Sequence, residues 1–165
     1  MTQLILRTCN ANGTSYNEFK WPTEVGAPVE ASDWDSRPCC GYGLHGYLYG
    51  EGHGQQLRTD DGAIWQVIEI PDGDEVVHIT DHDPADLKVK FRRGAMAFSG
   101  ARDEAIAYIV ERAPGKAVYG AKVTVGLSGT ATAGYRGTAT AGDGGTATAG
   151  YRRSEEHTSE LQSLS

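Results

Sequence analysis

The sequence predicts a small α+β domain followed by the start of a β-solenoid. Up to Pro114-Gly115 the chain is mixed, with Trp, Phe and many charged residues, and after that point Gly, Ala, Thr and Val dominate. The first part contains strand patterns and one helical pattern, whereas the second part has a strict period. We therefore expect a domain over residues 1–113, a junction over 114–120 and solenoid repeats over 121–152.

Apolar runs between turn residues mark the strands of the first part. "TQLILRT" (2–8) predicts a strand and "NANGT" (10–14) a turn. "IWQVIEI" (64–70) predicts a buried strand, and after the turn "PDGD" the run "EVVHIT" (75–80) is expected to pair with it. "LKVKF" (87–91) and "AMAFSG" (95–100) predict another hairpin, around Arg93-Gly94.

"ARDEAIAYIVERA" (101–113) is the one clear helical pattern. Ser99 is the expected N-cap, acidic residues suit the first turn, and Pro114-Gly115 ends the helix. Its apolar residues follow the helical spacing: Ala105, Ile106, Ile109, Val110 and Ala113. Together with Ile64, Val67 and Ile68 they predict a separate core, so we expect the domain to fold without residues 121–165.

The second part repeats every eight residues from Ala121, as AKVTVGLS, GTATAGYR, GTATAGDG and GTATAGYR. Tyr135 returns at Tyr151 while Asp143 lies between them, so the full unit has sixteen residues. In "TAT" the alternation of a strand sends both Thr to one face and the Ala to the other. Glycine-rich turns then close each coil. A flexible linker is the alternative, because many Gly-rich segments are linkers.

This repeat resembles the central repeats of bacterial ice nucleation proteins. It shares their sixteen-residue period, their "AGY" turn and a Thr-x-Thr motif in each coil, over residues 121–152. The resemblance implies a non-catalytic repeat protein that orders water or ice on Thr ladders, with Tyr135 and Tyr151 stacked along one edge. The implied water-binding residues are Thr130, Thr132, Thr138, Thr140, Thr146 and Thr148. The family often has Ser where Gly129, Gly137 and Gly145 stand here.

The tail over residues 153–165 breaks the period. One permitted codon choice for residues 153–163 reproduces the adapter commonly ligated to short-read sequencing libraries. We interpret the tail as non-native and expect it to be disordered. The natural chain would then have Gly at position 153 and continue through further repeats.

The Gly-rich stretch "CCGYGLHGYLYGEGHG" (39–54) predicts a tight loop with Leu44, Tyr47, Leu48 and Tyr49 packed inward. Its Cys39, Cys40, His45 and His53 are donors that zinc accepts, but their spacing fits no standard zinc pattern. We therefore expect no metal and no cofactor. A second polar cluster, His78 with "DHDPAD" (81–86), indicates a solvated turn.

The "C…GLHG" loop, the "W-x-V-x-E" strand and the "VKF" strand resemble an uncharacterised bacterial and phage domain that precedes GTATAG repeats. The alternative to the water-ordering hypothesis is that residues 1–113 are an enzyme or ligand-binding module, with the repeats as a spacer. An ADP-ribosyltransferase-like fold is the enzyme version, with Glu69 and Glu104 as available carboxylates.

The net charge of −7 argues against non-specific nucleic-acid binding. The apolar runs are too short to span a bilayer, so no integral membrane segment is expected. No secretory signal is visible at the start, which predicts a cytoplasmic location by default, with the cell surface as the alternative. Three cysteines without a signal indicate reduced thiols. Self-association through the solenoid is a further possibility for the longer protein.

Overall fold

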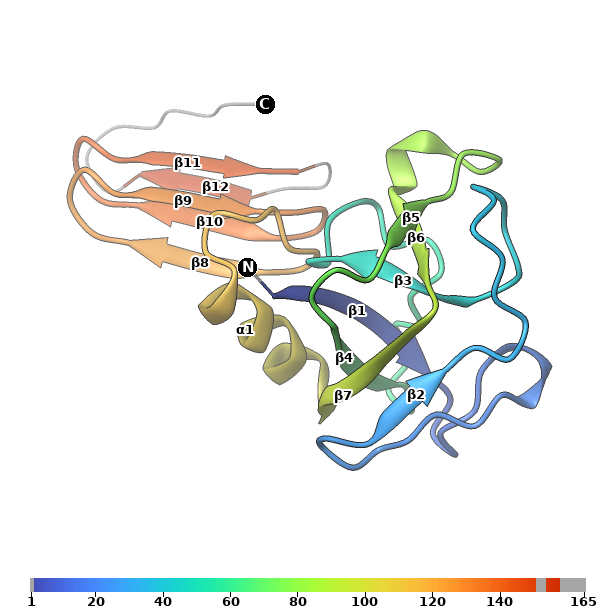
Figure 1. Cartoon of the computed structure of the whole chain (residues 1–165). Helices are drawn as coiled ribbons and strands as arrows, with labels where there is room; N and C mark the ends of the chain where they lie inside the picture. The colour runs from blue at the N-terminus through green and yellow to red at the C-terminus, as the bar shows by residue number, and fades with distance from the viewer. Residues whose placement is uncertain (1, 151–153, 158–165) are drawn as a thin grey trace.

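The computed structural model describes residues 2–150 and the backbone of residues 154–157. A strongly curved antiparallel sheet and a single helix precede a stack of short parallel strands (Figure 1). The expected α+β domain is therefore mostly β. In the described residues the one α-helix is α1 (Arg102–Arg112), and short 3-10 turns occur at Tyr16–Glu18 and Pro84–Asp86.

The curved sheet has seven antiparallel strands in the order β2-β7-β4-β1-β3-β6-β5. Its long central strands, β1 and β4, pair over seven positions, from Gln3↔Ile70 to Cys9↔Ile64. The predicted strands over 2–8 and 64–70 are thus confirmed. The strands are β1 (Gln3–Cys9), β2 (Pro28–Glu30), β3 (Leu44–Leu48), β4 (Ile64–Ile70), β5 (Val76–His78), β6 (Lys88–Phe91) and β7 (Arg93–Gly100).

Both predicted hairpins are wrong. β5 pairs with β6 and not with β4. β6 and β7 do not pair with each other, although only Arg92 separates them; three strands lie between them in the sheet. In a flat sheet that separation would be about 19 Å, whereas a one-residue connection spans at most about 7 Å. The sheet must therefore curl into a half-barrel that brings its two halves together at Arg92.

The predicted helix is confirmed, but its predicted N-cap is wrong. Ala101 occupies the cap position without a side-chain hydrogen bond, because Ser99 is still part of β7 and pairs with Gln66 of β4. Asp103 and Glu104 lie in the first turn as expected. The helix buries Ala105, Ile106 and Ile109 against the sheet, and Val110 is half-buried.

The repeats form short parallel strands in two sheets. β8 (Lys122–Val125) pairs with β10 (Thr138–Ala141), and β9 (Thr130–Ala133) pairs with β11 (Thr146–Ala149), each with an offset of sixteen residues. This confirms the sixteen-residue unit over the described repeats and contradicts the linker alternative. We call residues 121–150 the repeat segment.

The expectation of a disordered tail fails for four residues. Ser154–His157 form β12, which pairs in parallel with β10 from Thr138↔Ser154 to Ala141↔His157. The open edge of β10 presents backbone N–H and C=O groups, and these pair with any extended segment whatever its side chains. The rest of the tail lies outside the described residues, and its adapter origin stays a prediction.

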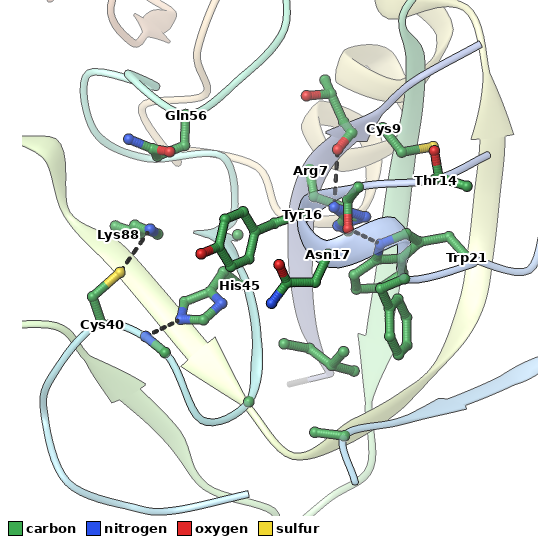
Figure 2. Close-up of a pocket in the computed structure, with 18 of the residues that line it drawn as sticks. Arg7, Cys9, Thr14, Tyr16, Asn17, Trp21, Cys40, His45, Gln56 and Lys88 are labelled. Carbon is green, nitrogen blue, oxygen red and sulfur yellow. Dashed lines mark hydrogen bonds between the residues drawn. The ribbon is translucent and has the colours of Figure 1, made fainter. Parts of the chain in front are cut away.

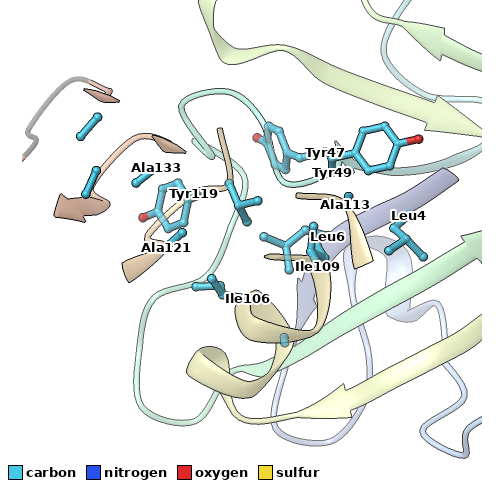
Figure 3. Close-up of a cluster of buried hydrophobic side chains, with 14 of the residues drawn as sticks. Leu4, Leu6, Tyr47, Tyr49, Ile106, Ile109, Ala113, Tyr119, Ala121 and Ala133 are labelled. Carbon is cyan, nitrogen blue, oxygen red and sulfur yellow. The ribbon is translucent and has the colours of Figure 1, made fainter. Parts of the chain in front are cut away.

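Two clusters of buried side chains fill the molecule. One lies between β2, β7 and the inner strands and contains Ile68, Phe91 and Met96. The other joins the helix and sheet to the repeat segment, so that Leu6, Ile109, Tyr119 and Ala133 belong to one cluster (Figure 3). The core predicted for residues 1–113 is therefore not separate from the repeats, and Val118 and Tyr119 of residues 114–120 are buried in the same cluster.

Candidate functional site

The repeat segment turns its threonines outward and its alanines inward. The six alanines of β9, β10 and β11 are at most 4% exposed, whereas every Thr of these strands is exposed or half-buried. In β8, Val123 and Val125 take the positions of the alanines, opposite Ala139 and Ala141. The alternation predicted from "TAT" is thus present in the structure.

The six predicted threonines do not share one surface. Thr130 and Thr132 of β9 lie in register with Thr146 and Thr148 of β11, which makes an uninterrupted two-by-two array. We call this the β9–β11 face. Thr138 and Thr140 belong to the other sheet. The sequence period alone did not separate the two sheets, because both halves of the unit read "TAT".

The β8–β10 face carries a less regular array. Thr140 lies opposite Thr124, but Thr138 lies opposite Lys122. A long ammonium side chain thus replaces the first Thr of this ladder. Of the two faces, the β9–β11 face offers the more uniform surface.

Glycine precedes each Thr-x-Thr strand because neighbouring units approach closely there. A Cβ atom at Gly145 would lie 2.7 Å from the carbonyl oxygen of Gly129 and 2.9 Å from the Cβ of Ala141. At Gly137 the distance to the carbonyl oxygen of Ala121 would also be 2.7 Å. These distances are shorter than real Cβ contacts, so serine at these positions would require the stack to open.

An aromatic ladder runs along one corner of the repeat segment. Tyr135 stacks on Tyr119 with ring centroids 6.0 Å apart, and Tyr119 stacks on Trp65 at 6.2 Å. Tyr151, the other predicted stacking residue, lies outside the described residues. Tyr119 was not predicted from the sequence, although it lies sixteen residues before Tyr135 and the period indicates it. The ladder therefore begins inside the first domain, on a strand of its sheet.

Backbone hydrogen bonds also join the segment after the first domain to the repeats. The N–H of Gly134 donates to the carbonyl of Val118 (2.8 Å), and the N–H of Gly120 donates to the carbonyl of Tyr135 (2.7 Å). Residues 118–120 thus occupy the place of the preceding turn, and the first domain covers the end of the repeat stack.

The first domain also contains a cavity of about 970 Å³. It lies where β1 and β3 separate, since their ladder contains only Ile5↔Leu48 and Leu6↔Tyr47. Figure 2 shows Arg7, His45 and Lys88 around it. Glu69 and Glu104, the carboxylates named for the enzyme alternative, do not line this cavity.

Arg7 is the most unusual group of this cavity. Its guanidinium lies 3.3 Å from the ring centroid of Trp21 and donates to the side chain of Gln66 and the carbonyl of Thr8. Its buried Nε has no hydrogen-bond partner among the described residues. Burial lowers the pKa of Arg7 to about 9, partly opposed by the thiol of Cys9.

The cysteines and histidines considered as metal donors do not converge. His45 accepts from the N–H of Gly41 in the cavity wall, whereas His53 packs on Tyr135 with centroids 4.9 Å apart. Cys39 and Cys40 are free thiols. Within residues 2–150, no group of three or more His, Cys, Asp or Glu side chains is arranged to hold a metal ion.

His45 is held neutral by its surroundings. Burial lowers its pKa to about 4, with further lowering by the charges of Lys88 and Lys90. Arg7 acts in the same direction and Asp33 in the opposite one. The predicted tight loop around it is in fact strand β3 from Leu44 onward, with Tyr47 and Leu44 buried as expected.

The second polar cluster anchors loops. Asp81 accepts from the N–H of Cys40 (3.0 Å), and Asp83 caps the 3-10 turn by accepting from the N–H of Ala85. Buried Asp86 accepts from the hydroxyl of Tyr47 (2.9 Å). These hydrogen bonds give the acidic residues of "DHDPAD" structural roles, so no catalytic role is needed to explain them.

The molecule is thus a mostly β protein in which an antiparallel half-barrel is followed by a repeat stack with threonine on its outer faces. The chain is distantly similar to ice nucleation proteins. It is 33% identical to the ice nucleation protein of Xanthomonas campestris pv. translucens over 118 residues, 72% of this chain and 7% of that protein. For the ice nucleation protein of Pseudomonas fluorescens the identity is 33% over 64% of this chain and 8% of that protein.

The ice nucleation protein InaU of Pantoea ananas is 32% identical over 65% of this chain and 10% of that protein. The chain therefore spans a tenth or less of the length of these curated relatives. An alignment of 118 residues is longer than the chain from Ala121 onward, so the similarity extends into the first domain.

No family model and no solved structure matches the chain. The resemblance of residues 1–113 to an uncharacterised bacterial and phage domain therefore stays a prediction. Within the described residues, no helix has the length and apolar character needed to cross a membrane. The cytoplasmic location also stays a prediction.

Proposed function

We propose that this chain is a non-catalytic repeat protein whose β-solenoid orders water on threonine ladders, with the first domain as the cap of the solenoid. The observation that carries the proposal is the in-register array of Thr130, Thr132, Thr146 and Thr148 over an interior in which the alanines of β9, β10 and β11 are buried. The similarity to ice nucleation proteins supports the same function.

The array suits water for geometrical reasons. Neighbouring strands are about 4.8 Å apart, and alternate residues along one strand are about 6.7 Å apart. Threonine methyls at these fixed positions leave water bonded mainly to itself, while the hydroxyls anchor the layer. Small alanines inside hold the two sheets close, which keeps each outer face flat.

We assign the water-ordering surface to the β9–β11 face, because Lys122 interrupts the other ladder. A small template stabilises only a small ice embryo. The described array extends over only two neighbouring strands on this face, or about 5 Å along the stack. We therefore expect the present chain not to nucleate ice above the background of its buffer.

The experiment is droplet freezing of a rebuilt protein. Gly replaces Arg153, and the sixteen-residue unit is copied some dozens of times behind the same first domain. In one variant Val replaces the threonines equivalent to Thr130 and Thr132, and in its matched control Val replaces those equivalent to Thr138 and Thr140. Valine keeps the β-branched shape and removes the hydroxyl.

We expect the rebuilt protein to raise the freezing temperature of the droplets. Val on the β9–β11 face should lower it more than Val on the opposite face, with unchanged circular dichroism. Equal effects of the two variants would refute the assignment to one face. Freezing of both variants at the temperature of the unmodified protein would refute water ordering.

A second candidate function rests on a different observation, the cavity beside Arg7. Under this second hypothesis, the first domain is a ligand-binding module and the repeats are a spacer.

A further inference from the structure

The cavity lies in a gap of the sheet. β1 and β3 are neighbours, but their ladder stops at Leu6↔Tyr47. Beyond this pair the ladder has no further partners between the described residues of the two strands, and residues 7–9 of one and 44–46 of the other line the cavity. A break of this kind in the middle of a sheet leaves backbone and side-chain polar groups directed at a shared space.

Within the part of the chain that the structure describes, two cations on opposite sides of this space form no ion pair with a carboxylate. Arg7 is 7% exposed and binds only neutral acceptors, with its Nε unpaired. Lys88 is 8% exposed, and its ammonium donates to the thiol of Cys40 at 3.5 Å. Burying a cation without a counter-ion costs several kcal/mol. The fold therefore maintains an unfavourable arrangement at this place.

The charge of the cavity wall differs from that of the domain. Residues 1–113 contain 18 acidic and 10 basic residues. The wall contains three cations, Arg7, Arg58 and Lys88, and one carboxylate, Asp33. Arg58 is paired with Asp60. Lys90, fully buried next to this wall, donates to the carbonyl of Gly41 and adds positive potential.

Aromatic rings complete the wall. Trp21 stacks under Arg7 and Phe19 packs on Trp21 edge to face, at 5.1 Å between centroids. Tyr16, 88% exposed, also lines the cavity, and its ring appears between Arg7 and Lys88 in the view of Figure 2. Guanidinium groups held flat on an aromatic ring are suited to planar or tetrahedral oxyanions.

We propose that this cavity binds a small organic anion, whose carboxylate or phosphate group lies between Arg7 and Lys88 and whose apolar or aromatic body lies against Phe19 and Tyr16. The proposal deepens the ligand-binding candidate and is independent of water ordering by the repeats. Arg7 and Lys88 are the recognition groups, and no reaction is assigned to them.

The experiment is calorimetric titration of the full chain with four probes: phenyl phosphate, phenylacetate, benzyl alcohol and inorganic phosphate. Benzyl alcohol has the ring without the charge, and inorganic phosphate has the charge without the ring. We expect phenyl phosphate or phenylacetate to bind at least about tenfold more tightly than benzyl alcohol. The stronger of the two distinguishes a phosphate ligand from a carboxylate ligand.

Two variants test the residues. Lys88→Met keeps the length of the buried stem. We expect it to weaken the binding of the preferred anion by about tenfold or more, and to leave the melting temperature of the protein unchanged or higher. Arg7→Met should weaken it similarly. Lys116→Met removes the same charge next to Tyr49, away from the cavity, and should leave binding unchanged.

Three results would overturn the proposal. The first is benzyl alcohol binding as tightly as the anions. The second is that neither phenyl phosphate nor phenylacetate binds at millimolar concentration. The third is equal affinity of the wild-type chain, Lys88→Met and Arg7→Met. Droplet freezing of the rebuilt protein is unaffected by any of these results, so the two proposals fail separately.

Discussion

Replacing Tyr119 with Ala should remove much of the packing that joins the first domain to the repeats. The ring of Tyr119 is 2% exposed and lies between those of Trp65 and Tyr135. Truncating a buried aromatic side chain costs about 3–5 kcal/mol, part of which is the loss of two ring pairs worth about 0.5–1.5 kcal/mol each. We therefore expect the free energy of unfolding to fall by about 3–5 kcal/mol.

Urea denaturation measures the change in the free energy of unfolding. Far-UV circular dichroism follows the strands, and tryptophan fluorescence follows the surroundings of Trp65. Tyr119→Phe is the matched control, and it should cost less than about 1 kcal/mol because Phe keeps the ring and both of its stacking contacts. A double-mutant cycle with Tyr135→Ala should give a coupling of about 0.5–1.5 kcal/mol. Equal losses in the Ala and Phe variants, or a coupling near zero, would refute the aromatic ladder as a joint.

Two further predictions concern a histidine and a glycine. Because the pKa of His45 is lowered to about 4, from about 6.5 for a histidine in the unfolded chain, the unfolded chain binds its proton first as the pH falls. The free energy of unfolding should fall by up to about 3 kcal/mol between pH 6.5 and 4, and His45→Gln should flatten this pH dependence; parallel profiles for the two proteins would contradict it. Gly145→Ala should destabilise the repeat segment by about 1–3 kcal/mol in urea denaturation, since its Cβ would lie 2.7 Å from the oxygen of Gly129. Gly126→Ala meets no atom within 4 Å and is the control; similar effects of the two would show that the units are not closely packed.

The elements with a strong local signal were predictable. β4 occupies the predicted residues 64–70, and α1 begins and ends within two residues of the predicted limits. The sixteen-residue offset of the repeat strands follows directly from the period in the sequence. In these places the hydrophobic pattern and the turn residues are enough, because neighbouring residues decide the structure.

The pairing of the strands was not predictable from neighbours alone. β6 and β7 follow each other in the chain and lie on different sides of the sheet, which depends on the curvature of all seven strands. The strand over Leu44–Leu48 was concealed by glycines, of which Gly46 is required because a Cβ atom there would lie 2.8 Å from the carbonyl oxygen of Leu6. The sequence shows the glycine but not the backbone that approaches it.

The candidate sites divide in the same way. The outward threonines follow from alternation along each strand, whereas their division between two sheets needs the turns in three dimensions. Arg7 looked like an ordinary residue in the strand "TQLILRT". Its unpaired Nε and its position over Trp21 arise from segments fourteen or more residues away in the chain. Long-range contacts of this kind leave no local pattern.

The aromatic ladder from Trp65 through Tyr119 to Tyr135 also has a consequence for synthesis on the ribosome. β10 and β11 each bond to a strand sixteen residues earlier, which has already been made when the later one emerges. The first domain is complete before them, and Tyr119 and the carbonyl of Val118, which follow it in the chain, are the first place to dock. The repeats can then be added in order, one unit at a time, from a single fixed start. A chain assembled in this way never holds many unpaired repeat strands at once, so the length of the stack adds little to its risk of aggregation while it is being made.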